Sequence, residues 1–197
     1  MDIRSQITQI IEQIEPFDQK EVEHKLFVTE WINSGAGLFR IEKPATPRTH
    51  LISYFVPVDE ANGKILLVHH KKANLWLPPG GHVDVNEHPR VAAAREMEEE
   101  LFVQADFMME EPLLLTVTDT VNDANSHTDV ALWYLVRGDS NVLYTFDERE
   151  FYEVRWFSIE EIPSKMTEPH LSRFVNKYTN RYETCPFSEV KRRETLR

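Results

Sequence analysis

The sequence has a single cysteine, Cys185, among its 197 residues, so no disulfide can form within the chain. Disulfides persist mainly in oxidising compartments, and their absence favours the cytoplasm as the location. No secretory signal is recognisable at the first residues, Met1–Arg4. We therefore expect a cytoplasmic protein, and we interpret Cys185 as incidental because no histidine stands beside it.

Long apolar runs and an excess of positive charge are also missing. No stretch approaches the about 20 apolar residues that span a bilayer, so we expect no membrane segment. Lysine and arginine total 22 against 33 aspartates and glutamates, which gives a net charge of −11. Nucleic-acid binding relies on Lys and Arg to neutralise phosphates, so we expect no nucleic-acid partner. The hydrophobic share of 41% is that of a globular protein with a core.

Glycine is scarce, with only six residues, and two of them are adjacent at Gly80 and Gly81. They follow Pro78 and Pro79, and residues without a side chain permit close approach of the backbone at such a turn. A helix is expected to start near His88, with Pro89 well suited to its first helical position.

The last turns of this expected helix carry four glutamates and one arginine. At about 3.6 residues per turn, Glu96, Glu99 and Glu100 share one face, and Arg95 lies one turn before Glu99. The side expected to face a core consists of Val91, Ala94, Met97 and Leu101. Three crowded carboxylates repel one another, and a hard divalent cation such as Mg²⁺ would offset that cost. The alternative is an acidic amphipathic helix whose glutamates are merely solvated.

The spacing of these residues resembles the sequence box of the Nudix hydrolase family. That box reads Gly, five residues, Glu, seven residues, Arg-Glu, an aliphatic, any residue, Glu-Glu, any residue, Gly and an aliphatic. This chain supplies Gly81, Glu87, Arg95, Glu96, Met97, Glu99, Glu100 and Val103. Phe102 departs from the box, because it stands where the family has the glycine that usually ends the helix. A phenylalanine there either accepts strain of about 1 kcal/mol or lets the chain leave the helix differently.

The resemblance implies an enzyme that uses Mg²⁺ or Mn²⁺ to hydrolyse a phosphoanhydride bond. Its substrate would be a small nucleotide-type molecule, either a nucleoside diphosphate linked to another group or a nucleoside triphosphate. The implied metal ligands are the Gly81 carbonyl and the side chains of Glu96, Glu99 and Glu100. The alternative is a Nudix-like module that binds a nucleotide without cleaving it. The segment Thr118–Val121 has none of the family's subgroup signatures, so the particular substrate stays open.

Further catalytic roles are also implied by the resemblance. Arg95 and Glu87 would fix the ligand glutamates in place. An acidic residue shortly before the tryptophan of a later strand often reaches back to the metal in this family, and here both Glu150 and Glu153 precede Trp156. We prefer Glu150, because it is expected in the loop, where its side chain has freedom to reach. The alternative is a merely solvated acidic loop. Glu99, Glu100 and Glu150 are the candidates for the general base, and the choice among them stays open.

Two helices are expected ahead of the box. The first, from Ser5 to Glu15, has an apolar stripe made of Ile7, Ile10, Ile11 and Ile14. Asp18 and Glu21 resemble a capping box that starts a second helix, whose apolar residues are Val22, Leu26, Val28 and Trp31. We expect these helices to pack against the domain or against a second copy of the chain in a homodimer. A lid over the site is the alternative.

Strands are expected where β-branched and aromatic residues gather between turn signals. They are Leu51–Val58, Lys64–His70, Leu113–Val121, His127–Arg137 and Val154–Phe157, and a last helix contains Leu171 and Phe174. The pattern predicts an α+β fold. The resemblance implies the Nudix α/β/α sandwich with a mixed sheet over residues 48–183. A helical extension and linker, 1–47, would precede it, and a tail, 184–197, would follow.

His127 and Asp129 lie two residues apart on an expected strand, so their side chains point to the same face. They either bind the leaving half of a substrate or hydrogen-bond each other at the strand end.

Overall fold

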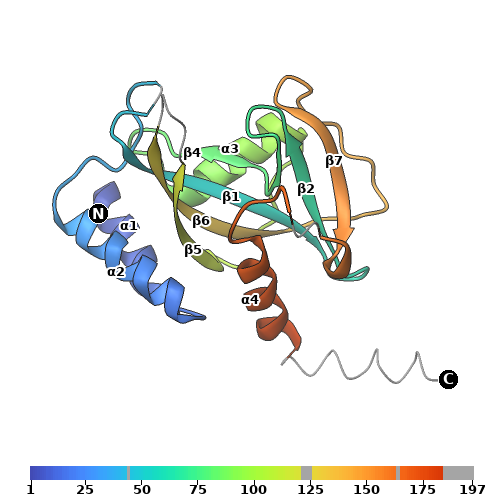
Figure 1. Cartoon of the computed structure of the whole chain (residues 1–197), viewed down its shortest axis with the longest axis horizontal. Coiled ribbons are helices and arrows are strands. Elements are labelled where there is room, and N and C mark those ends of the chain that lie inside the picture. The colour runs from blue at the N-terminus through green and yellow to red at the C-terminus, as the bar shows by residue number, and fades with distance from the viewer. Residues whose placement is uncertain (44, 121–125, 163–164, 184–197) are drawn as a thin grey trace.

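A mixed sheet forms the centre of the computed structural model, which describes residues 1–43, 45–120, 126–162 and 165–183 (Figure 1). The described residues form seven strands: β1 Thr49–Asp59, β2 Lys64–His70, β3 Leu75–Leu77, β4 Gly80–His82, β5 Leu114–Thr120, β6 His127–Arg137 and β7 Phe151–Ser158. The main path runs β3-β2-β1-β6-β5, with β4 paired to β1 and β7 to β2. Only the β1–β6 pairing is parallel among these described strands.

Helices cover both faces of the sheet. They are α1 Ile3–Gln13, α2 Gln19–Asn33, α3 Pro89–Leu101 and α4 Leu171–Glu183, with a 3₁₀ turn, η1, at Ile159–Glu161. One apolar core lies between the sheet and α1, α2 and α3, and a second lies between the sheet and α4. This arrangement confirms the predicted α+β sandwich with helices at its N-terminus. Among the helices of the described residues, none has both the length and the apolar character of a membrane span.

The predicted strands agree with the structure except at some of their ends. Lys64–His70 and His127–Arg137 have the predicted bounds, whereas β1 and β7 are longer than expected. The strand predicted to end at Val121 is described to Thr120. Val121, Cys185 and the tail 184–197 lie outside the described residues, so the predictions made for them are untested.

The first helix buries its predicted stripe. Ile7, Ile10, Ile11 and Ile14 are at most 6% exposed and belong to the core that α3 also joins. Burying four such side chains contributes roughly 1.5–3 kcal/mol each before entropy losses. The first helix is therefore packed against the domain, as one of the predicted alternatives had it. The division of the chain at residue 48 stays a prediction.

The second helix buries a different face from the predicted one. Val28 is buried as expected, but Val22 is 37% and Leu26 60% exposed, while Glu21 and His24 are at most 5% exposed. The reason lies in β5, which has a strand neighbour on one side only and presents unpaired amides on the other. A polar face on α2 meets those amides, so the apolar spacing was a misleading guide there.

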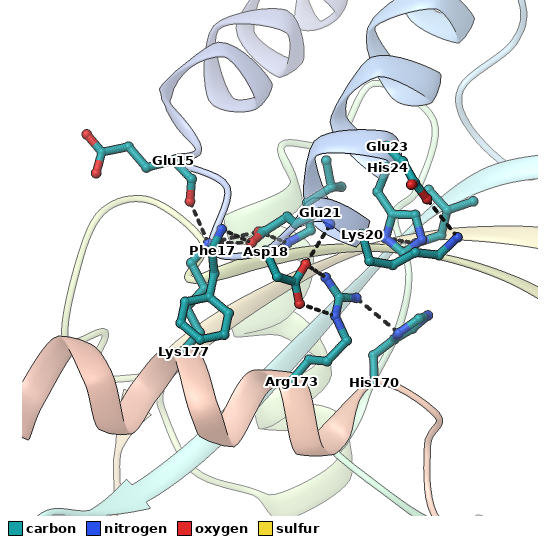
Figure 2. Close-up of polar contacts among 12 residues, drawn as sticks. Glu15, Phe17, Asp18, Lys20, Glu21, Glu23, His24, His170, Arg173 and Lys177 are labelled. Carbon is teal, nitrogen blue, oxygen red and sulfur yellow. Dashed lines mark hydrogen bonds and ion pairs between the residues drawn. The ribbon is translucent and has the colours of Figure 1, made fainter.

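Hydrogen bonds join α2 to the edge of the sheet and to α4 (Figure 2). The amide of Leu115 donates to Glu21 Oε1 at 3.0 Å, and the amide of Val117 donates to His24 Nδ1 at 3.3 Å. Lys177 Nζ of α4 binds both oxygens of Glu21, at 2.8 and 2.9 Å. The helices of opposite faces thus meet around the edge of β5.

Helix α3 starts and ends as its sequence suggests, but one apolar residue is turned outward. His88 caps the start, with Nδ1 accepting a hydrogen bond from the amide of Arg90, and Pro89 is the first helical residue. Val91, which we predicted to face the core, is 56% exposed. The face that packs on the sheet contains Ala92, Ala93, Met97 and Leu101. Glu100 is buried on the same helix.

Candidate active site

The glycine turn lies against both β1 and α3. Gly80 has a φ of +140°, and a Cβ on it would lie 2.2 Å from the carbonyl oxygen of Ser53. A Cβ on Gly81 would lie 2.4 Å from Oε1 of Glu96. Both positions need glycine because the backbone is in close contact with its neighbours. The turn is therefore pressed against the glutamate-bearing face of α3.

Arg95 connects the start of the box to its glutamates. Its Nε and Nη2 donate to the two oxygens of Glu87 at 3.0 Å each, and its Nη1 donates to Glu96 Oε1 at 2.8 Å. Nη2 also reaches the carbonyl of His82 at 3.0 Å. The contact with Glu99, which we predicted as the brace, is longer at 3.5 Å. Glu87 and Glu96 are thus the principal partners of Arg95.

These ion pairs shift the pKa of both partners. The hydrogen bonds that Arg95 donates to Glu87 and Glu96 hold the pKa of Arg95 above its usual value, so the guanidinium is permanently charged. Burial alone would raise the pKa of Glu87, but Arg95 and the Asp84 amide hold it below its usual value. The bidentate pair is the geometry that gives such contacts their strength.

The three glutamates differ in exposure. Glu100 is 4% exposed, and its Oε2 accepts a hydrogen bond from the amide of Gly80 at 2.9 Å. The side chain of Glu96 is 15% exposed and that of Glu99 61% exposed. Burial raises the pKa of Glu96 and Glu100, and the charges of nearby carboxylates raise them further. Burial and crowding thus disfavour the charged forms of Glu96 and Glu100. A cation beside these carboxylates would stabilise their charged forms.

Glu150 lies in the loop before β7, which is held against the end of α3. The amide of Asp147 donates to the carbonyl of Glu100 at 2.8 Å, and the carbonyl of Glu150 accepts from the amide of Lys71 at 2.8 Å. The charge of Glu150 contributes to the raised pKa of both Glu96 and Glu100. The structure therefore holds this loop against the end of α3 that carries the box glutamates.

Phe102 ends α3 in the left-handed conformation, with φ 56° and ψ 31°. Its amide donates to the carbonyl of Glu98, and its side chain is 59% exposed. We expected Phe102 either to accept a strained backbone or to let the chain leave the helix differently, and the structure shows the strained backbone. The chain therefore adopts a left-handed turn there although the residue is not glycine.

A second polar group lies at the start of β6. His127 Nε2 is 3.4 Å from Asp129 Oδ2, which agrees with the predicted contact between them. The structure adds His50 of β1 and His82 of β4, whose rings lie 5.0 Å apart. Sequence reasoning missed both histidines because they are far apart in the chain and follow no motif. Burial lowers the pKa of His82 to about 3, so its ring is neutral.

The sequence model of the NUDIX domain matches residues 49–178. The chain belongs to the Nudix family. That match contains the whole box and every strand of the described sheet. It leaves α1 and α2 outside the matched region.

Solved structures agree with the family assignment. A MutT NUDIX hydrolase from Burkholderia pseudomallei is 28% identical, with a TM-score of 0.52 over 66% of this chain and 97% of that one. A MutT protein from Methanosarcina mazei Go1 is 17% identical, with a TM-score of 0.56 over 68% of this chain and 94% of that one. The E. coli ORF135 protein is 21% identical, with a TM-score of 0.54 over 73% and 99% of the two chains. The last two show likeness of fold alone.

No curated protein sequence matches this chain. The family match and the Burkholderia relative together assign the chain to the Nudix-type pyrophosphohydrolases.

Proposed function

We propose that this Nudix protein hydrolyses a phosphoanhydride bond in a small nucleotide, with Mg²⁺ or Mn²⁺ as cofactor. The substrate class is a nucleoside diphosphate linked to another group, or a nucleoside triphosphate, and the product is a nucleoside monophosphate. The observation that supports this most is the packing of Glu96 and Glu100 against the Gly80–Gly81 turn.

In this proposal the cation is held by the carboxylates of Glu96, Glu99 and Glu100 and by the Gly81 carbonyl. These are the hard oxygen donors that Mg²⁺ prefers. The raised pKa of Glu96 and of Glu100 fits that assignment, because burial and crowding disfavour their charged forms until a cation compensates. When bound, such a cation neutralises charge on the diphosphate and makes a water molecule more acidic.

Arg95 and Glu87 would hold the ligand face in position. Nη1 of Arg95 donates to Glu96, and its Nε and Nη2 donate to Glu87 and to the carbonyl of His82. The amide of Asp84 donates to Glu87 at 2.9 Å, which ties this residue to its own loop. Because every nitrogen of the guanidinium has an acceptor, Glu96 has little freedom to rotate away from the turn.

The proton of the attacking water would pass to one of three carboxylates. One oxygen of Glu100 already accepts the Gly80 amide, whereas Glu99 is 61% exposed at the helix surface. Glu150 comes from the loop before β7 and lies near enough for its charge to act on Glu96 and Glu100. Replacing each in turn by glutamine, and comparing the pH profiles of kcat, would identify the base.

The test is a panel of nucleoside triphosphates and nucleoside diphosphate derivatives, with p-nitrophenyl phosphate as the monoester. We expect nucleoside monophosphate as the product at millimolar Mg²⁺ or less Mn²⁺, and no turnover of the monoester. Faster monoester cleavage, or full activity after exhaustive chelation, would contradict the proposal. Binding of a nucleotide without turnover would support the non-catalytic module instead. A homodimer and a cytoplasmic location stay predictions, which light scattering and cell fractionation would test.

A further inference from the structure

Three strands bring His50, His82 and Asp129 together on the face of the sheet that α4 covers. His50 pairs with Asp129 in the parallel β1–β6 register, and His82 of β4 pairs with Ile52 of β1. One ligand atom from each of the three side chains lies within 4.8 Å of the other two. His50 is 0% exposed. Buried imidazole and carboxylate groups are unfavourable unless their charges and lone pairs have partners.

The hydrogen bond of His50 Nδ1 decides which of its ring atoms carries the proton. Nδ1 lies 3.0 Å from the carbonyl oxygen of Pro47, which can only accept, so Nδ1 carries the hydrogen. In the neutral ring, Nε2 then has a lone pair and no hydrogen. A histidine held through Nδ1–H to a backbone carbonyl, with a free Nε2, is the arrangement found in metal-ligating histidines.

The partner of that lone pair is a carboxylate oxygen. Nε2 of His50 and Oδ1 of Asp129 lie 3.2 Å apart, yet both atoms are buried and neither completes a hydrogen bond. Two lone pairs that face each other at this distance repel unless something positive lies between or beside them. Either a second proton on His50 or a metal cation meets that need.

We propose that His50, His82 and Asp129 bind one Zn²⁺ ion. Zinc ligands stand about 2.0–2.2 Å from the metal, so two of them in a tetrahedral site are separated by about 3.3 Å. The His50–Asp129 contact has that separation already. The ligand atom of His82 lies within 4.8 Å of the other two, and a rotation of its side chain would bring it to the ion. Imidazole ligands favour zinc over Mg²⁺, which demands oxygen donors.

His127 supports the same carboxylate from its other side. Its Nε2 is 3.4 Å from Asp129 Oδ2, and its ring stacks on that of His50 with centroids 5.3 Å apart. A contact to Oδ2 leaves Oδ1 directed at His50 and fixes the orientation of the carboxylate. The zinc site therefore has a positioning residue as well as three ligands.

The zinc site and the glutamates of α3 lie on opposite faces of β4. Successive strand residues point to opposite faces, and Gly81 faces Glu96 of α3. His82, the next residue, consequently faces the α4 side, where His50 and Asp129 lie. The ion would tie β4 to β1 and β6 directly behind the glycine turn, so its role is to steady that turn. The inference does not depend on the proposed hydrolysis.

The test is a zinc titration of the full-length protein after exhaustive chelation, in millimolar Mg²⁺, against a competing chromophoric chelator. We expect one ion per chain with a Kd tighter than about 1 μM. The X-ray absorption spectrum of the zinc complex should show two imidazole ligands with nitrogen at about 2.0 Å. Zinc should also raise the melting temperature of the wild type.

Matched variants separate this site from others. Asp129→Asn and His82→Gln should each weaken zinc binding at least tenfold and abolish the rise in melting temperature. His82 is only partly buried, so its variant serves if Asp129→Asn fails to fold. His88→Asn, which removes another histidine but keeps a capping side chain, should bind zinc as the wild type does. Glu99→Gln should also keep the tight site.

Three results would overturn the proposal. The first is a wild-type protein that takes up no zinc at micromolar free concentration, which would leave a doubly protonated His50 paired with Asp129 as the account of the contact. The second is unchanged zinc binding in both Asp129→Asn and His82→Gln. Loss of zinc binding in Glu99→Gln alone would likewise place the ion at the glutamates.

Discussion

The amide of Gly80 donates a hydrogen bond to Oε2 of Glu100 at 2.9 Å, across twenty residues of sequence. This bond joins the glycine turn to the last turn of α3. It satisfies one oxygen of a carboxylate that is 4% exposed and that burial would otherwise leave unpaired. The turn packs so closely on α3 that a side chain at Gly81 would overlap the carboxylate of Glu96.

Gly81→Ala should lower kcat by about 10- to 100-fold, because its Cβ would lie 2.4 Å from Oε1 of Glu96 and displace that carboxylate. The free energy of unfolding should fall as well, because Glu96 can move aside only by weakening its hydrogen bond with Arg95. Steady-state kinetics and thermal unfolding measure the two effects. Gly37→Ala is the control, because among the described residues its Cβ meets only Pro47, at an ordinary 3.5 Å. Wild-type kcat in Gly81→Ala would mean that the position of Glu96 is unimportant.

Phe102→Gly should stabilise the protein by about 1 kcal/mol, because the residue has a φ of 56° that only glycine adopts without cost. Its side chain is 59% exposed, so little packing is lost. Chemical denaturation gives the free energy of unfolding. Phe102→Ala removes the same ring but keeps a Cβ, so it should show no such gain. A loss of stability in Phe102→Gly would show that packing of the ring outweighs the strain.

Glu21→Gln should destabilise the fold by about 3 kcal/mol, because it leaves the buried Lys177 without its charged partner. Urea unfolding measures the loss. Glu23→Gln is the matched control on the same helix. Its pair with Lys20 is about half exposed on both sides, and its loss should cost less than about 1 kcal/mol. Equal effects in the two variants would mean that the link between α2 and α4 is energetically unimportant.

Glu168 should make stability fall as the pH rises. Burial raises its pKa from 4.5 to about 7, so the unfolded chain ionises first. Between pH 4.5 and 7 the folded state holds the extra proton, and the free energy of unfolding decreases by roughly 3 kcal/mol in total, at about 1.36 kcal/mol per pKa unit.

Glu168→Gln should remove that decrease, so the variant should exceed the wild type in stability above pH 7 and match it near pH 4. Denaturant unfolding across this pH range measures the difference. Glu160→Gln, at an exposed position, should follow the wild type throughout. A constant difference between wild type and Glu168→Gln at all pH values would contradict the raised pKa.

Local patterns in the sequence were sufficient wherever neighbouring residues decide the structure. The isoleucine stripe of α1 predicts its buried face, and the apolar run at 65–68 indicates a strand, which is β2 with the predicted bounds. Pro89 and Phe102 mark the first helical residue and the C-cap of α3. The spacing from Gly81 to Val103 was enough to indicate the family. The glutamates of this box contact the glycine turn because β4 pairs with β1 and α3 packs on both strands.

Contacts between distant segments could not be predicted in the same way. Glu21 is buried because an amide of β5 and a lysine of α4 require an acceptor, and these partners lie 94 and 156 residues away. His50, His82 and Asp129 meet only through the register of β1 with β4 and β6. Val91 turns outward because the inward position is taken by its neighbours Ala92 and Ala93. Tertiary packing decides each of these cases.

The central claim is that a cation held by the α3 glutamates drives hydrolysis, and one kinetic comparison tests it most directly. Wild type, Glu99→Gln and Glu98→Gln are freed of metal, and the turnover of a nucleotide substrate is measured during a Mg²⁺ titration. The account predicts that the wild-type rate rises from near zero, that Glu98→Gln follows it, and that Glu99→Gln is slower by several orders of magnitude. Near-wild-type turnover in Glu99→Gln, or a rate that is independent of Mg²⁺, would contradict the account.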